Sequence, residues 1–304
     1  MQKACTSFRY RLFTSTIKPY KMNIKKNIIK AFIGGIAACL CMACGGSDSK
    51  DYWGDTSGGG DEEPTENPNA SKPRYIWLDA AANFPDFANS KENIARDLAL
   101  AKDAGFTDIV VDVRPTTGDV LFKTNHVDQV KFMYAWIGSN YTKVERTATW
   151  DYLQAFVDEA RKQGLRIHAA INTFVGGNQI DGGTGLLYRD QSKAAWATQM
   201  NMQTGITSVM NTSESAKFFN PAHPEVQTFL CNLLKDLASY DLDGIFLDRG
   251  RFLNLQADFS EESRKQFEAY MGGIKIQNYP DDILAPGASS LPATYPKYMT
   301  KWLE

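Results

Sequence analysis

Apolar positions along residues 74–252 change repeatedly between strand-like runs and helix-like periodicity. Short apolar runs predict strands at residues 75–79, 109–114, 167–172 and 243–248. Apolar residues at three- and four-residue spacing predict helices between these runs, from an N-cap at Ser90 to Gly105, over residues 150–161, and after Pro224. Strands that alternate with helices in this way are typical of βα units and a parallel sheet.

The connections between these elements are of two unequal kinds. The loops from helix to strand are short, whereas the loops from strand to helix are long, which places the functional loops at the carboxyl ends of the strands, as in a barrel. One further helix is expected over residues 260–270, and it brings the βα units to four. Four strands would leave two open apolar edges, so we expect an α/β fold of the (β/α)8 TIM-barrel type. Residues 73–304 would be its N-terminal part, truncated after about the first four β/α units, with the other half encoded downstream.

The N-terminus has the pattern of a bacterial export signal. Three lysines at positions 25, 26 and 30 precede the apolar run of residues 31–43, which is too short to span a bilayer as a helix. Met22 fits a translation start better than Met1 does, because residues 1–21 carry no export pattern. We therefore expect residues 1–43 to be a leader with a lipoprotein signal peptide.

The apolar run ends at Ala43, Cys44 and Gly45, which resemble the lipobox of bacterial lipoproteins. Acylation of Cys44 would anchor the protein to a membrane of the cell envelope, and we expect the outer membrane, facing the periplasm or the cell surface. The alternative is a soluble secreted protein cut elsewhere in this region. Residues 44–72 are acidic, rich in Gly, Ser and Pro, and typical of a flexible tether.

Composition restricts the classes of partner and cofactor. With 43% hydrophobic and 22% charged residues, the chain can bury the core of an ordinary globular domain. A net charge of -2 without a basic cluster beyond the N-terminus argues against nucleic acid as a partner. Three histidines and no spaced Cys or His cluster argue against zinc, and we expect no metal and no cofactor.

The strongest candidate for chemistry is Asp248, where the apolar run of residues 243–248 ends. Acidic residues at the carboxyl ends of barrel strands lie where barrel enzymes do their chemistry. Arg249 and Arg251 follow at once, and either would favour the charged form of the carboxyl group. The alternative is that Asp248 only forms salt bridges with these arginines and holds the loop.

Several segments together resemble the glycosyl hydrolase-like 10 family, a bacterial barrel family. They are residues 75–79, 113–115 with 118–122, 167–174, 220–226, 241–248 and 259–270. The resemblance runs from Arg74 to the end of the sequence. One departure is the Thr116 and Thr117 pair, where the family tends to carry Arg and Gly.

This resemblance implies a glycoside hydrolase-like lipoprotein that hydrolyses the O-glycosidic bonds of an oligo- or polysaccharide. Such cleavage usually needs two carboxyl groups, and Asp248 would be the nucleophile or base. We expect the proton donor on a later strand beyond residue 304, which would leave this chain alone inactive, and we interpret Asp79 and Asp112 as structural. The alternative function is a non-catalytic glycan-binding envelope lipoprotein.

Arg249 and Arg251 are also candidates for substrate binding, together with five other residues. Arg114 and Asn172 each end a predicted strand and offer hydrogen bonds to sugar hydroxyls, or they pin a loop instead. The aromatic residues Trp136, Tyr188 and Trp196 lie in the long loops and could stack on sugar rings, or they pack those loops.

Overall fold

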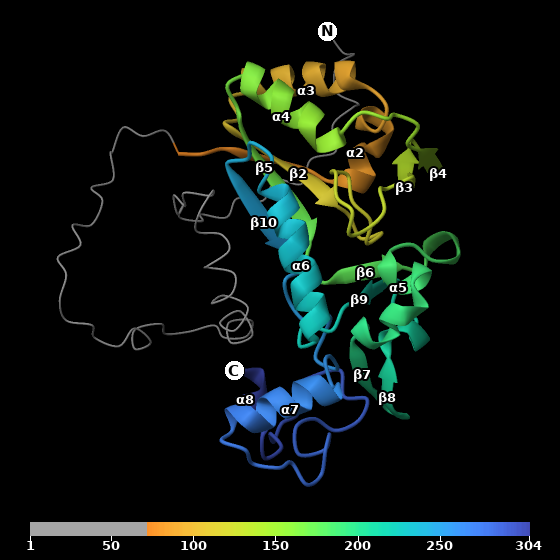
Figure 1. Cartoon of the computed structure of the whole chain (residues 1–304), viewed down its shortest axis with the longest axis vertical. Helices are drawn as coiled ribbons and strands as arrows, with labels where there is room; N and C mark the ends of the chain where they lie inside the picture. Colours follow the sequence, from red (N-terminus) through yellow and green to blue (C-terminus); the bar gives the residue numbers. More distant parts are fainter. Residues whose placement is uncertain (1–71) are drawn as a thin grey trace, which may run out of the picture.

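A computed structural model describes residues 72–304 of the chain (Figure 1). The predicted signal peptide, the lipidation site at Cys44 and nearly all of the tether lie outside the described residues. Among the described residues, no helix is long and apolar enough to cross a membrane.

The centre of the fold is a parallel sheet of four strands in the order β1-β2-β5-β10, which confirms the four predicted strands. The strands are β1 (Tyr75–Leu78), β2 (Asp108–Arg114), β5 (Arg166–Asn172) and β10 (Gly244–Asp248). Each pairs in parallel with its neighbour, so their carboxyl ends meet at the same edge of the sheet. The protein is therefore of mixed α/β class.

Helices cover one face of this sheet (Figure 1). They are α2 (Ala80–Phe87), α3 (Lys91–Asp103), α4 (Tyr152–Lys162) and α6 (Pro224–Leu237). Alternate strand residues such as Ile76, Val111 and Ile167 pack with the apolar sides of these helices in one core. The predicted N-cap at Ser90 is confirmed, since its side chain accepts a hydrogen bond from the Asn93 N–H.

The opposite face of the sheet carries a group of aromatic rings. The Trp77 and Phe246 ring centroids lie 5.5 Å apart, and Tyr75 lies 5.5 Å from His168. Tyr75 is 40% exposed and Trp77 37%, although both are strand residues of the central sheet. Within residues 72–304, β1 and β10 are the outer strands, so the sheet has two free edges beside this open aromatic face.

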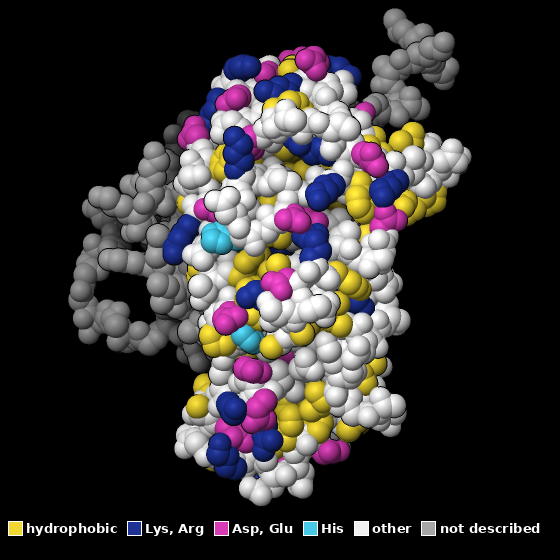
Figure 2. All heavy atoms as spheres, turned by 45° about the vertical axis from the view of Figure 1, so that its right-hand side comes forward, with side chains coloured by type: hydrophobic (Ala, Val, Ile, Leu, Met, Phe, Trp, Pro, Cys, Tyr) yellow, Lys and Arg dark blue, Asp and Glu magenta, His cyan; other side chains and the backbone are white. Residues whose placement is uncertain are grey.

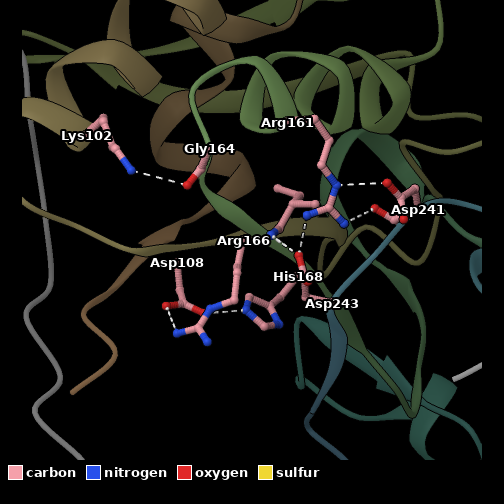
Figure 3. A network of polar contacts seen from close by, with 9 residues as sticks. Lys102, Asp108, Arg161, Gly164, Arg166, His168, Asp241 and Asp243 are labelled. Atoms are coloured by element: carbon pink, nitrogen blue, oxygen red, sulfur yellow. Dashed lines mark hydrogen bonds and ion pairs between the residues drawn. The ribbon is translucent and has the colours of Figure 1, made fainter. Parts of the chain in front are cut away.

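The amino ends of the strands are joined by ion pairs (Figure 3). Asp108 accepts hydrogen bonds from Arg166 at 2.7 Å and shares one with His168 at 2.8 Å. Arg161 of α4 donates to both Asp241 and Asp243, just before β10. Burial alone would raise the pKa of Asp108, but hydrogen bonds with Arg166, the Thr107 hydroxyl and His168 together lower it. This end of the sheet is a structural network.

The long loops contain short elements that the sequence pattern did not predict. They are the hairpin of β3 (Phe132–Ile137) and β4 (Asn140–Glu145), the pair β6 (Val175–Asn178) and β9 (Ala216–Phe218), the pair β7 (Gln199–Met202) and β8 (Gly205–Ser208), and the single turn α5 (Leu186–Arg189). Three 3-10 turns lie at Ile180–Gly182, Gln191–Trp196 and Val209–Asn211.

A small second core lies after β10. Helices α7 (Glu261–Tyr270) and α8 (Met299–Leu303) enclose it, and its buried residues are Phe259, Phe267, Ile276, Ile283, Leu284 and Met299. Asp258 connects this part to β7, because its carboxylate accepts hydrogen bonds from the Thr198 hydroxyl and the Gln199 N–H. Figure 1 shows this lobe beyond the carboxyl ends of the strands.

Candidate active site

Three carboxyl groups gather at the carboxyl ends of the strands. Leu78 of β1 pairs with Val111 of β2. Asp79, the next residue after Leu78, therefore lies beside Asp112, the next residue after Val111. Asp248 ends β10 opposite Asn172 of β5. The charges of Asp79 and Asp248 both act on Asp112. The strand order therefore places Asp112 between two other carboxyl groups.

Asp112 holds a proton at neutral pH. The residue is 6% exposed, and burial raises its pKa from an ordinary value of 3.8 to about 8, with the negative charges of Asp79 and Asp248 adding to the rise. Hydrogen bonds from the N–H groups of Arg114 and Ala80 oppose this rise only in part. The sequence interpretation of Asp112 as structural missed this ionisation.

Asp79 has a clear structural task, as the sequence suggested. Its Oδ1 accepts a hydrogen bond of 2.8 Å from the Ala82 N–H and so caps the N-terminus of α2. The side chain is exposed, and it remains one of the two negative charges that face Asp112.

Asp248 is an exposed carboxylate held by its own loop. Its Oδ1 accepts a hydrogen bond of 2.7 Å from the Arg249 N–H, and Arg249 adopts a φ of 46°. In the described part of the chain, neither neighbouring guanidinium lies within ion-pair distance of Asp248; that of Arg251 donates to the carbonyls of Phe252 and Leu253. The expected contact of Arg249 or Arg251 with this carboxylate is therefore wrong, and so is the salt-bridge alternative.

Arg114 and Asn172 hold the backbone of the neighbouring segment. Arg114 is fully buried, and its guanidinium donates to the carbonyls of Asn172, Thr173 and Val175, while burial lowers its pKa to about 10. Asn172 is 5% exposed and donates in return to the Arg114 carbonyl at 3.0 Å. The expectation that Arg114 contacts sugar is wrong because no solvent reaches it. The loop-pinning alternative describes both residues.

The three aromatic candidates differ sharply in exposure. Trp136 is 57% exposed on the β3–β4 hairpin, whereas Trp196 is 6% exposed among Phe219 and Phe229. The Trp196 indole N–H donates to Glu225 at 2.8 Å. The sugar-stacking role of Trp196 is therefore wrong, because no ring face is open.

Tyr188 is half-buried against two glycines of the β6 region. A Cβ at Gly183 would lie 2.2 Å from the Tyr188 ring, and one at Gly177 would lie 3.1 Å from it. The absence of a side chain at these glycines lets the backbone approach the ring closely. The stacking role predicted for Tyr188 stays a prediction.

A further ion cluster fixes the loop after β2. Arg189 bridges Asp119, which is 6% exposed, and Asp128. Gly118 in this loop has a φ of 83°, and a Cβ there would meet the backbone of Gly176 at 2.9 Å. The sequence pattern gave no role to Arg189, whose partners lie 70 and 61 positions earlier in the chain.

A cavity of about 690 Å³ lies between the loop after β2, the segment that leads into α4, and helix α6. Among its lining residues are Lys123, Arg146, Trp150 and Asp236, and none of the expected site residues lines it. Within residues 72–304, no group of three or more His, Cys, Asp or Glu side chains is arranged to hold a metal ion.

The model of the family described as glycosyl hydrolase-like 10 matches residues 72–288. The chain belongs to this family. The match confirms the resemblance expected from the sequence, and it includes Asp79, Asp112 and Asp248.

One curated relative is an S-layer-related protein from Niallia circulans, which is 32% identical over 216 residues. The matched part is 68% of this chain but 13% of that relative, so the chain spans a small fraction of its length.

Two solved structures are weakly similar to this member of the glycosyl hydrolase-like 10 family. Alpha-L-fucosidase isoenzyme 2 from Paenibacillus thiaminolyticus is 19% identical with a TM-score of 0.46, and the match covers 69% of this chain and 28% of that one. The alpha-galactosidase from Lactobacillus brevis is 16% identical with a TM-score of 0.34, and the match covers 57% of this chain and 20% of that one.

Proposed function

We propose that the protein is a glycoside hydrolase in which Asp248 is the nucleophile or base for cleavage of O-glycosidic bonds in an oligo- or polysaccharide. The observation that carries the proposal is the exposed carboxylate of Asp248 at the carboxyl end of β10, in the group of strand-end carboxyl groups that also contains Asp79 and the buried Asp112. Membership of the glycosyl hydrolase-like 10 family supports it.

The two carboxyl groups suit different tasks. Asp248 is open to a substrate, and the Arg249 N–H orients it without neutralising it. It would attack the anomeric carbon or take a proton from the attacking water. Because the raised pKa keeps Asp112 neutral at pH 7, only Asp79 and Asp248 contribute negative charge among the three carboxyl groups at the strand ends.

Asp112 itself is too deeply buried to reach a leaving oxygen. The general acid that protonates this oxygen would therefore come from outside the described residues, as expected from the sequence.

The open face of the sheet supports a barrel as the complete fold. Tyr75, Trp77 and Phe246 form an aromatic layer on the side that would become the barrel interior. The free edges of β1 and β10 would each pair with a further strand, because an exposed apolar edge invites association. In this proposal, the four strands are the first half of a (β/α)8 barrel.

The cell envelope is the proposed location, with a lipid anchor at Cys44 and residues 44–72 as the tether. The name of the S-layer-related relative is compatible with a position at the cell surface. Metabolic labelling with palmitate tests the anchor: wild type should carry the label and Cys44→Ala should not. Label on the Cys44→Ala variant would contradict this assignment.

The catalytic proposal is tested with the full-length protein on a panel of neutral and acidic glycans, with release of reducing ends as the readout. Wild type should release them from at least one glycan, and Asp248→Asn should not. The alternative, a non-catalytic glycan-binding protein, predicts saturable binding with no release. Equal turnover by wild type and Asp248→Asn would overturn the role of this carboxylate.

A further inference from the structure

The β3–β4 hairpin turns its aromatic side chains outward. Tyr134 pairs with Lys143 and Trp136 with Tyr141 in an antiparallel register, so Phe132, Tyr134, Trp136 and Tyr141 share one face. The other face packs inward: Met133 is 4% exposed and Ala135 is 2% exposed, and β3 contacts α2. The outward aromatic side chains are therefore not part of the core.

These four rings form one continuous row, which we call the aromatic platform. The Phe132 and Tyr134 centroids are 6.2 Å apart, Tyr134 stacks with Tyr141 at 5.3 Å, and Tyr141 lies 5.3 Å from Trp136. Trp136 is 57% exposed and Tyr141 54%. Figure 2 shows hydrophobic side chains gathered at the upper right of the molecule, where the hairpin projects in Figure 1.

Polar groups from a distant segment hold the platform in place. Asp181, in the turn after β6, forms an ion pair with Lys143 and accepts a hydrogen bond of 2.9 Å from the Tyr134 hydroxyl. The Lys143 ammonium lies 4.0 Å from the centroid of the Phe132 ring. The row is thus pre-organised, and the two charges on its flank neutralise each other, which suits an uncharged ligand better than a charged one.

The exposed area also restricts the ligand. A large aromatic side chain offers about 150–250 Å², so Trp136 and Tyr141 at just over half exposure together present on the order of 200 Å². A specific protein interface needs about 800 Å² on each partner. The platform is therefore small for a protein partner, and its area suits a few sugar rings, whose apolar faces stack on aromatic rings.

We propose that the aromatic platform binds a neutral saccharide chain at a site separate from the carboxyl groups. Asp181, which contacts the platform, lies nine positions after Asn172, the last residue of β5. Nine residues span at most about 30 Å, so the platform lies within about this distance of the strand ends. A polysaccharide held on the platform would thus stay near Asp248. The choice of a saccharide as ligand rests on the proposed function, but binding to the platform requires no catalysis.

Affinity gel electrophoresis in gels that contain soluble starch, xylan, galactomannan or mixed-linkage glucan tests the proposal with the full-length protein. At least one glycan should retard wild type, and Trp136→Ala with Tyr141→Ala should weaken the retardation at least about tenfold, or about 1.4 kcal/mol. Tyr270→Ala is the matched control, because Tyr270 is 62% exposed on α7. It should leave binding unchanged, and thermal melts should show that all variants fold.

The possible failures are distinguishable. Asp248→Asn should bind the gels as wild type does. Wild type that is retarded by a glycan but releases no reducing ends from it would refute the catalytic role and leave the platform standing. Turnover by wild type with no retardation, or retardation that survives in the double variant, would overturn the platform. A wild-type oligomer in sedimentation velocity that dissociates in the double variant would also overturn it, because the rings would then face another protein chain.

Discussion

Replacement of Asp112 by Asn should make the protein more stable at neutral pH. Asn keeps the shape of the side chain and an oxygen that accepts the hydrogen bond from the Arg114 N–H. The folded protein holds a proton on Asp112 up to a pH of about 8, whereas the unfolded chain releases it near its ordinary pKa of 3.8. Folding at pH 7 therefore requires the uptake of one proton, and the wild type loses stability as the pH rises from about 4 to 8.

The magnitude follows from the pKa shift. Each unit of pKa difference is worth about 1.36 kcal/mol, so at pH 7 the penalty on the wild type reaches about 4 kcal/mol as an upper value. The variant has no such penalty. Its advantage over the wild type should be largest at pH 8 and above and should disappear near pH 4.

Urea unfolding of both proteins at half-unit steps from pH 4 to pH 9 measures this difference, because other titrating groups cancel between them. Asp158→Asn, at an exposed position of α4, is the control, and its effect should stay below about 0.5 kcal/mol at every pH. A difference between wild type and Asp112→Asn that does not grow with pH would refute the account of Asp112 as a protonated group.

Four other variants test the structural assignments. Trp196→Ala should lose about 3–5 kcal/mol of stability in guanidinium unfolding, because the ring is buried. Trp136→Ala should lose less than about 1 kcal/mol, because that ring is exposed. Similar losses in the two variants would contradict the difference in burial. Asp108→Asn should lose about 3 kcal/mol of stability at pH 7. The wild type should lose stability as the pH falls through the lowered pKa of Asp108, and the variant should lack this loss. A variant that loses as much stability at acid pH as the wild type does would exclude Asp108 as the cause of that loss. Gly118→Ala should lose at least about 1 kcal/mol in urea unfolding from its positive φ and its contact with Gly176, and a neutral effect would exclude this close approach.

Helices and strands with a long, strongly periodic pattern of apolar residues were predictable from the sequence, because burial of one side against the core imposes that pattern. The four strands, α3 with its Ser90 cap and α6 after Pro224 belong to this class. The hairpin β3–β4 was missed because its outward face is aromatic, which removes the usual alternation of apolar and polar residues. Helix α2 was missed because it is eight residues long and contains Pro85.

The candidate site was predictable only in part. The position of Asp248 at a strand end followed from the apolar run before it. The ionisation of Asp112 depends on Asp79, 33 positions earlier, and on Asp248, 136 positions later, so local pattern could not reveal it. Trp136 and Trp196 looked alike in sequence, and packing by Phe219 and Phe229 is what buries only the second.

The most direct test of the catalytic role of Asp248 is the kcat of the full-length protein on a cleaved glycan beside that of Asp248→Asn. The substitution removes the negative charge but keeps the acceptor for the Arg249 N–H, so folding and substrate binding should persist. The account predicts a loss in kcat of at least about a thousandfold, or about 4 kcal/mol of barrier, with KM within a few-fold of wild type. A kcat within tenfold of wild type would contradict it.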